Sequence, residues 1–371
     1  MILVFAFTLV SLFVPAAPDG GSATVPQWTK NVTRDLGLRR FDNFDTKTWT
    51  QQQGVAFLSS TRLAVYQVVR SEQVPALQAR SESGGAGSFQ LRIVILDVES
   101  GREIHHLELP TNAEQASVLP TTEAKFLVRT GNTLYLYSPD FERLATRLLP
   151  SGDRGNREEW QVRVSPSGSF VFLAHKLVFE SGDKDRIEVQ MLDASNLELL
   201  RTIPVSFLAF WSAGDDFLIS KTQSTRDEYA SVSLDGNWHP LLQDDPYCAH
   251  LYTFRALPSG NVAEVSCGFK ARVIDSSGKV LHSFRVETSQ AIDSVQGGDG
   301  FLAAQVFHRK TDSFGNGHSN HQGAIWQFRL GDSDPCRAVS AKYEGVRYTL
   351  GQKGALAVVD GESLSFFPPI E

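Results

Sequence analysis

The chain has 371 residues, of which 42% are hydrophobic and 21% are charged, and this is the composition of an ordinary globular protein. Its length allows one large all-β domain or two smaller ones. The net charge of -7 argues against a nucleic-acid partner, because a surface that binds nucleic acid is usually basic.

An apolar segment without charged residues opens the chain. Val14 and Ala16 occupy the small-residue positions that precede a cleavage site, so we interpret residues 1–17 as a secretory signal peptide and residues 18–30 as a linker. The alternative is an uncleaved anchor, although the run is short for a span of about 20 residues. No later stretch is apolar enough to cross a bilayer. The sequence therefore predicts a secreted or periplasmic protein without a membrane span after cleavage.

The clearest structural unit covers residues 160–205. Apolar runs at 160–164 and 170–174 flank the turn at 165–168, and runs at 187–192 and 197–205 flank a turn at 193–196. Four short apolar runs joined by turn residues predict a four-stranded antiparallel sheet.

The first hairpin of this unit recurs along the chain as a small or polar turn followed by an apolar strand. Taking one residue of each second strand as equivalent gives seven positions: Leu63, Phe126, Phe170, Phe217, Val262, Phe301 and Ala355. A period of roughly 40 to 50 residues with four strands per unit predicts a β-propeller.

Turns between the third and fourth strands recur six times, at 97–101, 138–140, 193–196, 233–236, 275–278 and 331–332. The seventh unit has only three strands, and residues 31–38 can supply its fourth. Closing the ring with strands from both ends of the chain removes an exposed sheet edge. We therefore expect an all-β protein, with residues 31–371 forming one seven-bladed β-propeller of four-stranded antiparallel blades.

Three segments resemble known propeller repeats. SPSGSFVFLA (165–174) is similar to the first hairpin of WD40-like bacterial repeats, and LDASNLELLRTIPV (192–205) resembles the repeat of YVTN-type surface propellers. LDVESGREIHHLEL (96–109) is similar to the turn of quinoprotein repeats but lacks their tryptophan. These are structural turn motifs, so the resemblance implies an architecture and no catalytic residue.

In a propeller, the turns joining strands one to two and three to four lie on one face of the ring, and the other connections lie on the opposite face. Here the first set is short. The long connections all belong to the second set: 71–88, 176–185, 221–228, 308–323, 151–158 and 243–248. Binding residues concentrate in loops on a rigid scaffold, so we expect a protein, peptide or glycan partner on the loop-rich face.

Two groups of residues in these connections could carry chemistry. His308, His318 and His321 could bind zinc or another transition metal, although their spacing matches no defined motif and solvated histidines are the alternative. Cys248 and Cys267 fall in one repeat and could form a disulfide in an exported protein; three separate buried thiols are the alternative. No sequence motif for a cofactor is present.

Catalytic motifs such as G-x-S-x-G and H-E-x-x-H are absent from the sequence. We therefore favour a non-enzymatic binding protein. The alternative is a hydrolase or lyase similar to propeller lactonases or sialidases, with a site in the central funnel that works with or without a metal. Such an enzyme would gather charged groups with perturbed pKa values at the funnel. The polar candidates on the innermost strands are Arg163, Arg255, Asp293 and Arg347; an outward-facing or locally paired side chain is the alternative for each.

Overall fold

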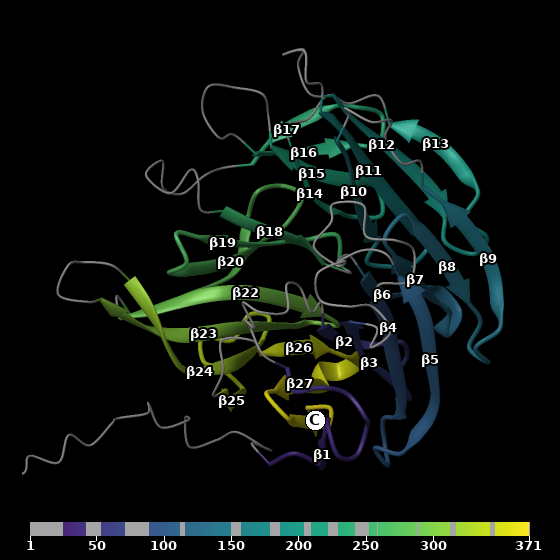
Figure 1. The fold of residues 1–371 in the computed structure, drawn as a ribbon. Coiled ribbons are helices and arrows are strands. Elements are labelled where there is room, and N and C mark those ends of the chain that lie inside the picture. Colours follow the sequence, from purple (N-terminus) through teal and green to yellow (C-terminus); the bar gives the residue numbers. More distant parts are fainter. Residues whose placement is uncertain are drawn as a thin grey trace, which may run out of the picture.

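The computed structural model describes residues 25–41, 53–70, 89–111, 116–149, 157–178, 186–203, 209–221, 229–241, 252–257, 259–287, 289–311, 317–341 and 346–370. Strands β1 to β28 form seven four-stranded sheets in which every neighbouring pair is antiparallel. The sheets stand around a common axis (Figure 1), and each innermost strand contacts the innermost strands of the two adjacent blades. The fold is the predicted seven-bladed β-propeller.

The first six blades each use four consecutive strands, ordered from the axis outwards. Blades 1 to 3 comprise β2 Gln53–Phe57, β3 Arg62–Arg70, β4 Phe89–Asp97 and β5 Glu103–Thr111; β6 Ala116–Pro120, β7 Phe126–Thr130, β8 Thr133–Tyr137 and β9 Arg143–Leu148; β10 Arg157–Val164, β11 Phe170–Val178, β12 Arg186–Asp193 and β13 Leu199–Ile203.

Blades 4 to 7 comprise β14 Ala209–Ala213, β15 Phe217–Lys221, β16 Tyr229–Ser233 and β17 Trp238–Pro240; β18 Tyr252–Ala256, β19 Val262–Ser266, β20 Lys270–Ile274 and β21 Val280–Arg285; β22 Gln290–Gly298, β23 Phe301–Thr311, β24 Gly317–Arg329 and β25 Arg337–Ala341; β26 Arg347–Leu350, β27 Leu356–Asp360, β28 Ser363–Phe367 and β1 Trp28–Asn31. Two single 3-10 turns, η2 Thr122–Ala124 and η4 Gln352–Gly354, lie in first hairpins.

The repeat positions from the sequence mark the second strands. Five of them are the first residue of that strand, Leu63 is the second residue of β3, and Ala355 immediately precedes β27. The apolar periodicity therefore located every blade.

The N-terminal strand closes the ring as expected, but it lies earlier than predicted. β1 pairs with β28, with Trp28 opposite Phe366 and Asn31 opposite Ser363, so it shares only Asn31 with the expected segment 31–38. The residues that follow cannot continue the strand, because Asn31 starts a hydrogen-bonded turn.

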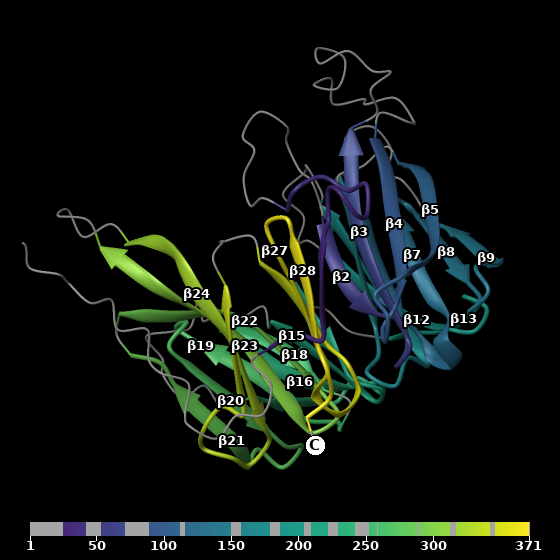
Figure 2. The same cartoon turned by 90° about the horizontal axis from the view of Figure 1, so that it is seen from below.

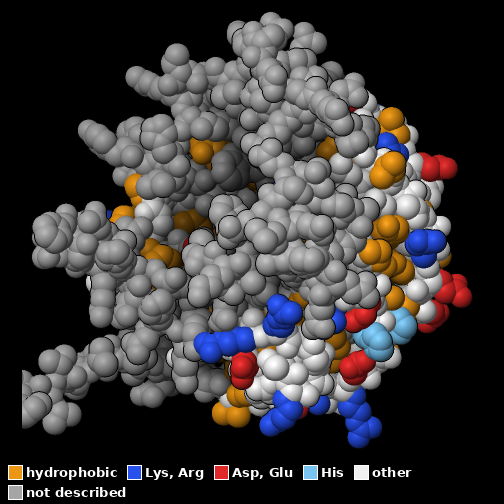
Figure 3. Space-filling model, viewed as in Figure 1, with side chains coloured by type: hydrophobic (Ala, Val, Ile, Leu, Met, Phe, Trp, Pro, Cys, Tyr) orange, Lys and Arg blue, Asp and Glu red, His pale blue; other side chains and the backbone are white. Residues whose placement is uncertain are grey.

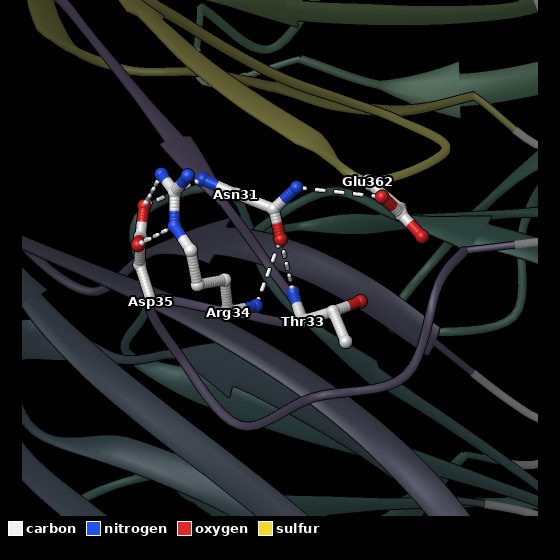
Figure 4. Close-up of polar contacts among 5 residues, drawn as sticks. All are labelled: Asn31, Thr33, Arg34, Asp35 and Glu362. Atoms are coloured by element: carbon white, nitrogen blue, oxygen red, sulfur yellow. Dashed lines mark hydrogen bonds and ion pairs between the residues drawn. The ribbon is translucent and has the colours of Figure 1, made fainter.

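Figure 4 shows this turn. The side-chain oxygen of Asn31 accepts hydrogen bonds from the backbone N–H groups of Thr33 (3.0 Å) and Arg34 (2.8 Å), and the Asp35 carboxylate accepts one from the Asn31 N–H (2.9 Å). This reciprocal arrangement resembles a capping box and directs the chain out of the sheet. Asn31 also donates to Glu362 at 3.4 Å, which links the turn to the hairpin of blade 7.

Apolar side chains between adjacent sheets hold the blades together. One cluster joins Val65 of blade 1 to Val359 and Phe366 of blade 7. Another joins Leu127 of blade 2 to Trp160 and Leu173 of blade 3. Burial of apolar surface at each such boundary is the main stabilising contribution in a ring that contains so little helix.

The two faces of the ring differ. The tight-turn face carries the turns between strands one and two and between strands three and four. The shortest of these turns is Asp299–Gly300, and the longest is 330–336. The loop-rich face carries the remaining connections, including 71–88 between β3 and β4. The C-terminal end of the described chain lies on the tight-turn face, where the Ile370 N–H donates to the Lys353 carbonyl at 2.9 Å (Figure 2).

Candidate functional site

The innermost strands carry a group of charged side chains that face the axis of the ring. Arg163 lies on β10, Arg255 on β18 and Asp293 on β22. All three side chains keep exposed surface, although the protein packed around them desolvates their charged groups. Arg347, on β26, is half-buried. Exposure on an innermost strand means that a side chain lines the central channel of the propeller. The structure thus brings together the four residues that the sequence offered as channel candidates.

Arg163 and Arg255 occupy equivalent positions in blades 3 and 5. Each is the penultimate residue of its strand, close to the tight-turn face, and each is followed three residues later by Pro-Ser-Gly in the first turn. Both alternate with buried neighbours, such as Val162 and Phe254, which pack between blades. The strand pleat therefore directs both guanidinium groups away from the blade interior.

Three arginines of blades 2, 3 and 5 have lowered pKa values. Burial lowers the pKa of Arg163, and the positive charge of Arg255 lowers it further. Burial also lowers the pKa of Arg129 to about 10, with a smaller contribution from the charge of Arg163. Arg129 is on β7, and its Nε donates to the Gly131 carbonyl at 2.9 Å. The pKa of Arg255 is lowered mainly by burial. The charge of Arg163 thus acts on Arg129, and the charge of Arg255 acts on Arg163.

The innermost strands of blades 6 and 7 carry one charged residue of each sign, Asp293 on β22 and Arg347 on β26. Burial raises the pKa of Asp293, and the charge of Arg347 partly opposes that rise. Tyr348 is buried beside them; its hydroxyl donates to the Ser294 carbonyl at 2.9 Å, and desolvation raises its pKa. Arg347 donates to the Gln53 carbonyl at 3.3 Å, which links blade 7 to blade 1.

Tyr66, on the second strand of blade 1, packs over the innermost strand β2 and against the apolar cluster between blades 1 and 2. A Cβ on Gly54 would lie 2.3 Å from the Tyr66 hydroxyl, so only a glycine on β2 allows the phenol ring to cross over this strand. Burial raises the pKa of Tyr66, while the charge of Arg347 has the opposite effect. Pattern analysis missed Tyr66, Arg129 and Tyr348 because second-strand and buried positions are normally read as packing; Gly54 was the available signal for Tyr66.

The predicted metal ligands can be placed only by their backbone. His308 lies in β23, and His318 and His321 lie in β24, so most of the expected 308–323 loop is strand. Arg309 pairs with Ser319 and Thr311 pairs with Gly317, so the β23–β24 hairpin continues through this segment. The polar composition of the segment gave no sign of these strands. The side chains of the three histidines lie outside the described residues. Among the residues whose side chains are described, no group of three His, Cys, Asp or Glu could hold a metal ion.

The cysteines differ in state. Cys267 is disulfide-bonded and lies in the β19–β20 turn, on the loop-rich face, whereas Cys336 is a free thiol. Cys248 lies outside the described residues, so its pairing with Cys267 stays a prediction.

Figure 3 views the molecule from its loop-rich face. The connections at 71–88, 179–185, 222–228 and 242–251 lie outside the described part of the chain. No helix in the described part is both long and apolar enough to span a membrane.

The chain is a seven-bladed β-propeller by fold, and comparisons with solved structures agree. It is similar to the acylaminoacyl peptidase of Pyrococcus horikoshii (9% identity, TM-score 0.54, covering 87% of this chain and 52% of that one). It is also similar to Raptor of Chaetomium thermophilum (8%, TM-score 0.53, covering 90% and 28%) and to the Dos1 propeller (13%, TM-score 0.43, covering 91% and 96%).

At these identities the likeness shows the fold alone. The chain spans about half of the peptidase and about a quarter of Raptor, so the activities of those whole proteins do not transfer to it. No protein-family model matches the sequence, and no curated protein matches it either.

Proposed function

We propose that this protein is a non-enzymatic binding propeller that takes a protein, peptide or glycan partner on its loop-rich face. The supporting observation is the difference between the two faces. The described turns of the tight-turn face are short, whereas β3 and β4 are joined by 71–88 and β17 and β18 by 241–251. A rigid ring with long connections on one side is the usual arrangement of a binding scaffold.

The test is to select ligands from a glycan array and a peptide library with the purified mature protein, and then to measure their affinity for two variants. The first replaces residues 71–88 by a short Gly-Ser linker between Arg70 and Phe89. The second, a matched control, reverses two charges in turns of the tight-turn face, Glu99→Lys and Lys279→Glu. We expect the first variant to lose at least about tenfold in affinity and the second to bind normally. The reverse result would contradict the proposal.

We also propose that the protein is exported. The apolar segment 1–17 and the disulfide at Cys267 support this, because disulfides persist in oxidising compartments. N-terminal sequencing of the secreted product should find the segment removed, and non-reducing peptide mass spectrometry should find Cys248 linked to Cys267. An intact N-terminus would argue for an anchor, and a Cys248 thiol that alkylates without reduction would contradict the pairing.

A second candidate function is hydrolysis or elimination at the channel. Asp293 favours it, because an exposed carboxyl whose pKa is raised by desolvation can act as a general acid or base. A panel of lactones and sialosides would test it. Turnover that disappears in Asp293→Asn and persists in the control Asp140→Asn would show that the protein is an enzyme. Absence of turnover on the whole panel would favour the binding function.

A further inference from the structure

We propose that a pocket on the tight-turn face, between blades 5 and 6, binds an ammonium group that carries an apolar side chain. The pocket has a volume of about 290 Å³ and is formed by the turns that join strands one and two in these blades, together with Leu330. An ammonium group beside an apolar side chain occurs in a free amino acid derivative and at the N-terminus of a peptide. The proposal is independent of the proposed function, because the pocket lies on the face opposite the long connections.

The pocket exists because the first turn of blade 6 contains glycines whose space blade 5 does not fill. A Cβ on Gly298 or on Gly300 would have no neighbour within 4 Å. In the first turns of blades 3 and 7 the preceding blade fills the corresponding space. A Cβ on Gly168 would lie 2.8 Å from the backbone of blade 2, and a Cβ on Gly354 would lie 2.7 Å from a side chain of blade 6. The boundary between blades 5 and 6 therefore keeps an opening that these two boundaries close.

Three apolar side chains line the pocket. Leu257 and Phe301 are buried, and Leu330 is half-buried. A Cβ on Gly297 would lie 2.4 Å from a methyl carbon of Leu257, so this leucine packs directly against the backbone of blade 6. The Leu330 N–H donates to the Gly300 carbonyl at 2.8 Å, which holds the outer wall against the turn. An apolar group that enters the pocket is removed from water by these side chains, and this burial favours binding.

The volume of the pocket fits one residue-sized group. A molecule of liquid water occupies about 30 Å³, so the pocket corresponds to about ten waters. Pockets for drug-sized ligands begin at about 300 Å³. The pocket is therefore suited to a single apolar side chain.

Asp299 gives the pocket its preference for a cation. Its Oδ2 accepts a hydrogen bond from the Lys353 backbone N–H at 2.5 Å, so blade 7 orients the carboxylate. Within the described part of the chain Asp299 has no other hydrogen bond and no ion pair, which leaves Oδ1 for a ligand. The Ser259 hydroxyl also lines the pocket and can accept a hydrogen bond. Because the Arg329 guanidinium already lies over the Phe301 ring, the ammonium group of the ligand is placed at the carboxylate.

Ligand-observed NMR titration of the purified protein tests the proposal at about pH 6.5, where α-amino groups are protonated. The first probe, phenylalaninamide, has both the ammonium group and the apolar side chain. N-acetylphenylalaninamide lacks the charge, and glycinamide lacks the apolar side chain. We expect saturable binding of phenylalaninamide and binding weaker by about tenfold or more for each of the other two, because each lacks one of the recognised groups. A fourth probe, the amide of the peptide Phe-Gly-Gly-Gly, distinguishes the sources: tighter binding than phenylalaninamide indicates a peptide N-terminus, and weaker binding indicates a free amine.

Two positions in the pocket provide independent variants. Gly298 has no positive φ, so a side chain at this position enters the open space without backbone strain. Gly298→Ala should weaken the binding of phenylalaninamide, and Gly298→Leu should abolish it, because the added carbons occupy the pocket. Asp299→Asn should weaken the binding of phenylalaninamide by about tenfold or more, since it removes a charge-assisted hydrogen bond. It should leave the binding of N-acetylphenylalaninamide unchanged, which a merely structural role of Asp299 would not produce.

The matched control is Asp215→Asn. Asp215 lies two residues before β15, as Asp299 lies two residues before β23, and its Oδ1 accepts a hydrogen bond from the Ser167 N–H of blade 3 at 3.2 Å. The control changes the same kind of turn contact outside the pocket and should bind phenylalaninamide like the wild type. The variant shortened at 71–88 should do so as well, which separates this pocket from the proposed partner surface.

Each variant is first checked for a cooperative unfolding transition, and the variants of Gly298 and Asp299 are read independently so that one misfolded protein does not end the test. The proposal would be overturned by any of three results. These are absence of saturable binding of both phenylalaninamide and the peptide, equal binding of phenylalaninamide and its acetylated form, and wild-type affinity in both Gly298→Leu and Asp299→Asn.

Discussion

Trp28 donates its indole N–H to the backbone carbonyl of Val98 at 2.7 Å, and this hydrogen bond joins the outermost strand of blade 7 to the outer turn of blade 1. The same indole ring stacks on Phe366 with 5.4 Å between ring centroids. The Trp28 side chain therefore connects the N-terminal strand β1 to its own sheet through Phe366 and to blade 1 through Val98. It adds to the backbone pairing of β1 with β28, which closes the ring.

Replacing Trp28 by phenylalanine should keep the stacking and remove the hydrogen bond to Val98. We expect the free energy of unfolding to fall by about 1 kcal/mol, the usual net contribution of one hydrogen bond. Urea unfolding followed by circular dichroism measures this. Trp238→Phe, on the exposed outermost strand of blade 4, is the control and should change stability less. Equal effects would show that Trp28 has no special role in closure.

Gly101 and Gly278 provide a matched pair of substitutions in equivalent turns. Both have a positive φ, +67° and +85°, so alanine costs about 1–2 kcal/mol at either position. A Cβ on Gly101 would also lie 2.8 Å from the Trp28 ring, whereas a Cβ on Gly278 would have no neighbour within 4 Å. Gly101→Ala should therefore be the more destabilising in thermal unfolding. The difference should disappear when Trp28 is also replaced by alanine, and its persistence would contradict this explanation.

Arg337 connects blade 6 to blade 7 through hydrogen bonds, and its side chain is buried, with only 2% of its surface exposed. It donates to the Gln327 side chain (3.1 Å) and to the carbonyls of Gly354 (3.0 Å) and Pro368 (2.6 Å). Arg337→Gln should lower the free energy of unfolding by about 3 kcal/mol, because several acceptors lose a charged donor.

The control for Arg337 is Arg201→Gln, which removes an exposed ion pair with Asp235. It should change stability by less than about 1 kcal/mol. Chemical denaturation of both variants decides the matter. Similar losses in the two variants would mean that the buried contacts at the junction of blades 6 and 7 contribute little.

Three aspartates in equivalent outer turns make stability depend on pH. A hydrogen bond from a nearby serine side chain is the largest cause of the lowered pKa of Asp97, Asp193 and Asp275. Because the folded-state pKa lies below the unfolded value of about 3.9, this stabilisation is complete above about pH 5 and is lost as the pH falls further.

The triple variant Asp97→Asn, Asp193→Asn and Asp275→Asn should therefore lose less stability than the wild type between pH 5 and pH 3. Urea midpoints measured across this range show the difference. Asp140→Asn, an exposed turn position in blade 2, should follow the wild-type curve. Parallel curves for wild type and triple variant would contradict the prediction.

Much of the fold could be predicted because a blade is a local unit. Phe170 and Phe217 begin their second strands where the repeat predicted, since apolar alternation and turn residues act over a few neighbouring positions. The same local signals failed for 308–323, where long-range pairing extends β23 and β24 through polar residues. They also misplaced the closing strand, because Trp28 is fixed by Phe366 and Val98, which lie far away along the chain.

The sequence by itself determined the number of blades, the order of their strands and the face that carries the long connections, because each follows from spacing along the chain. Only the tertiary structure decided which charged residues meet. Arg163 and Arg255 are 92 positions apart, and their charges interact only because the ring brings the innermost strands of separate blades around one axis. Electrostatic interaction depends on distance in space, and no periodicity in the sequence encodes that distance.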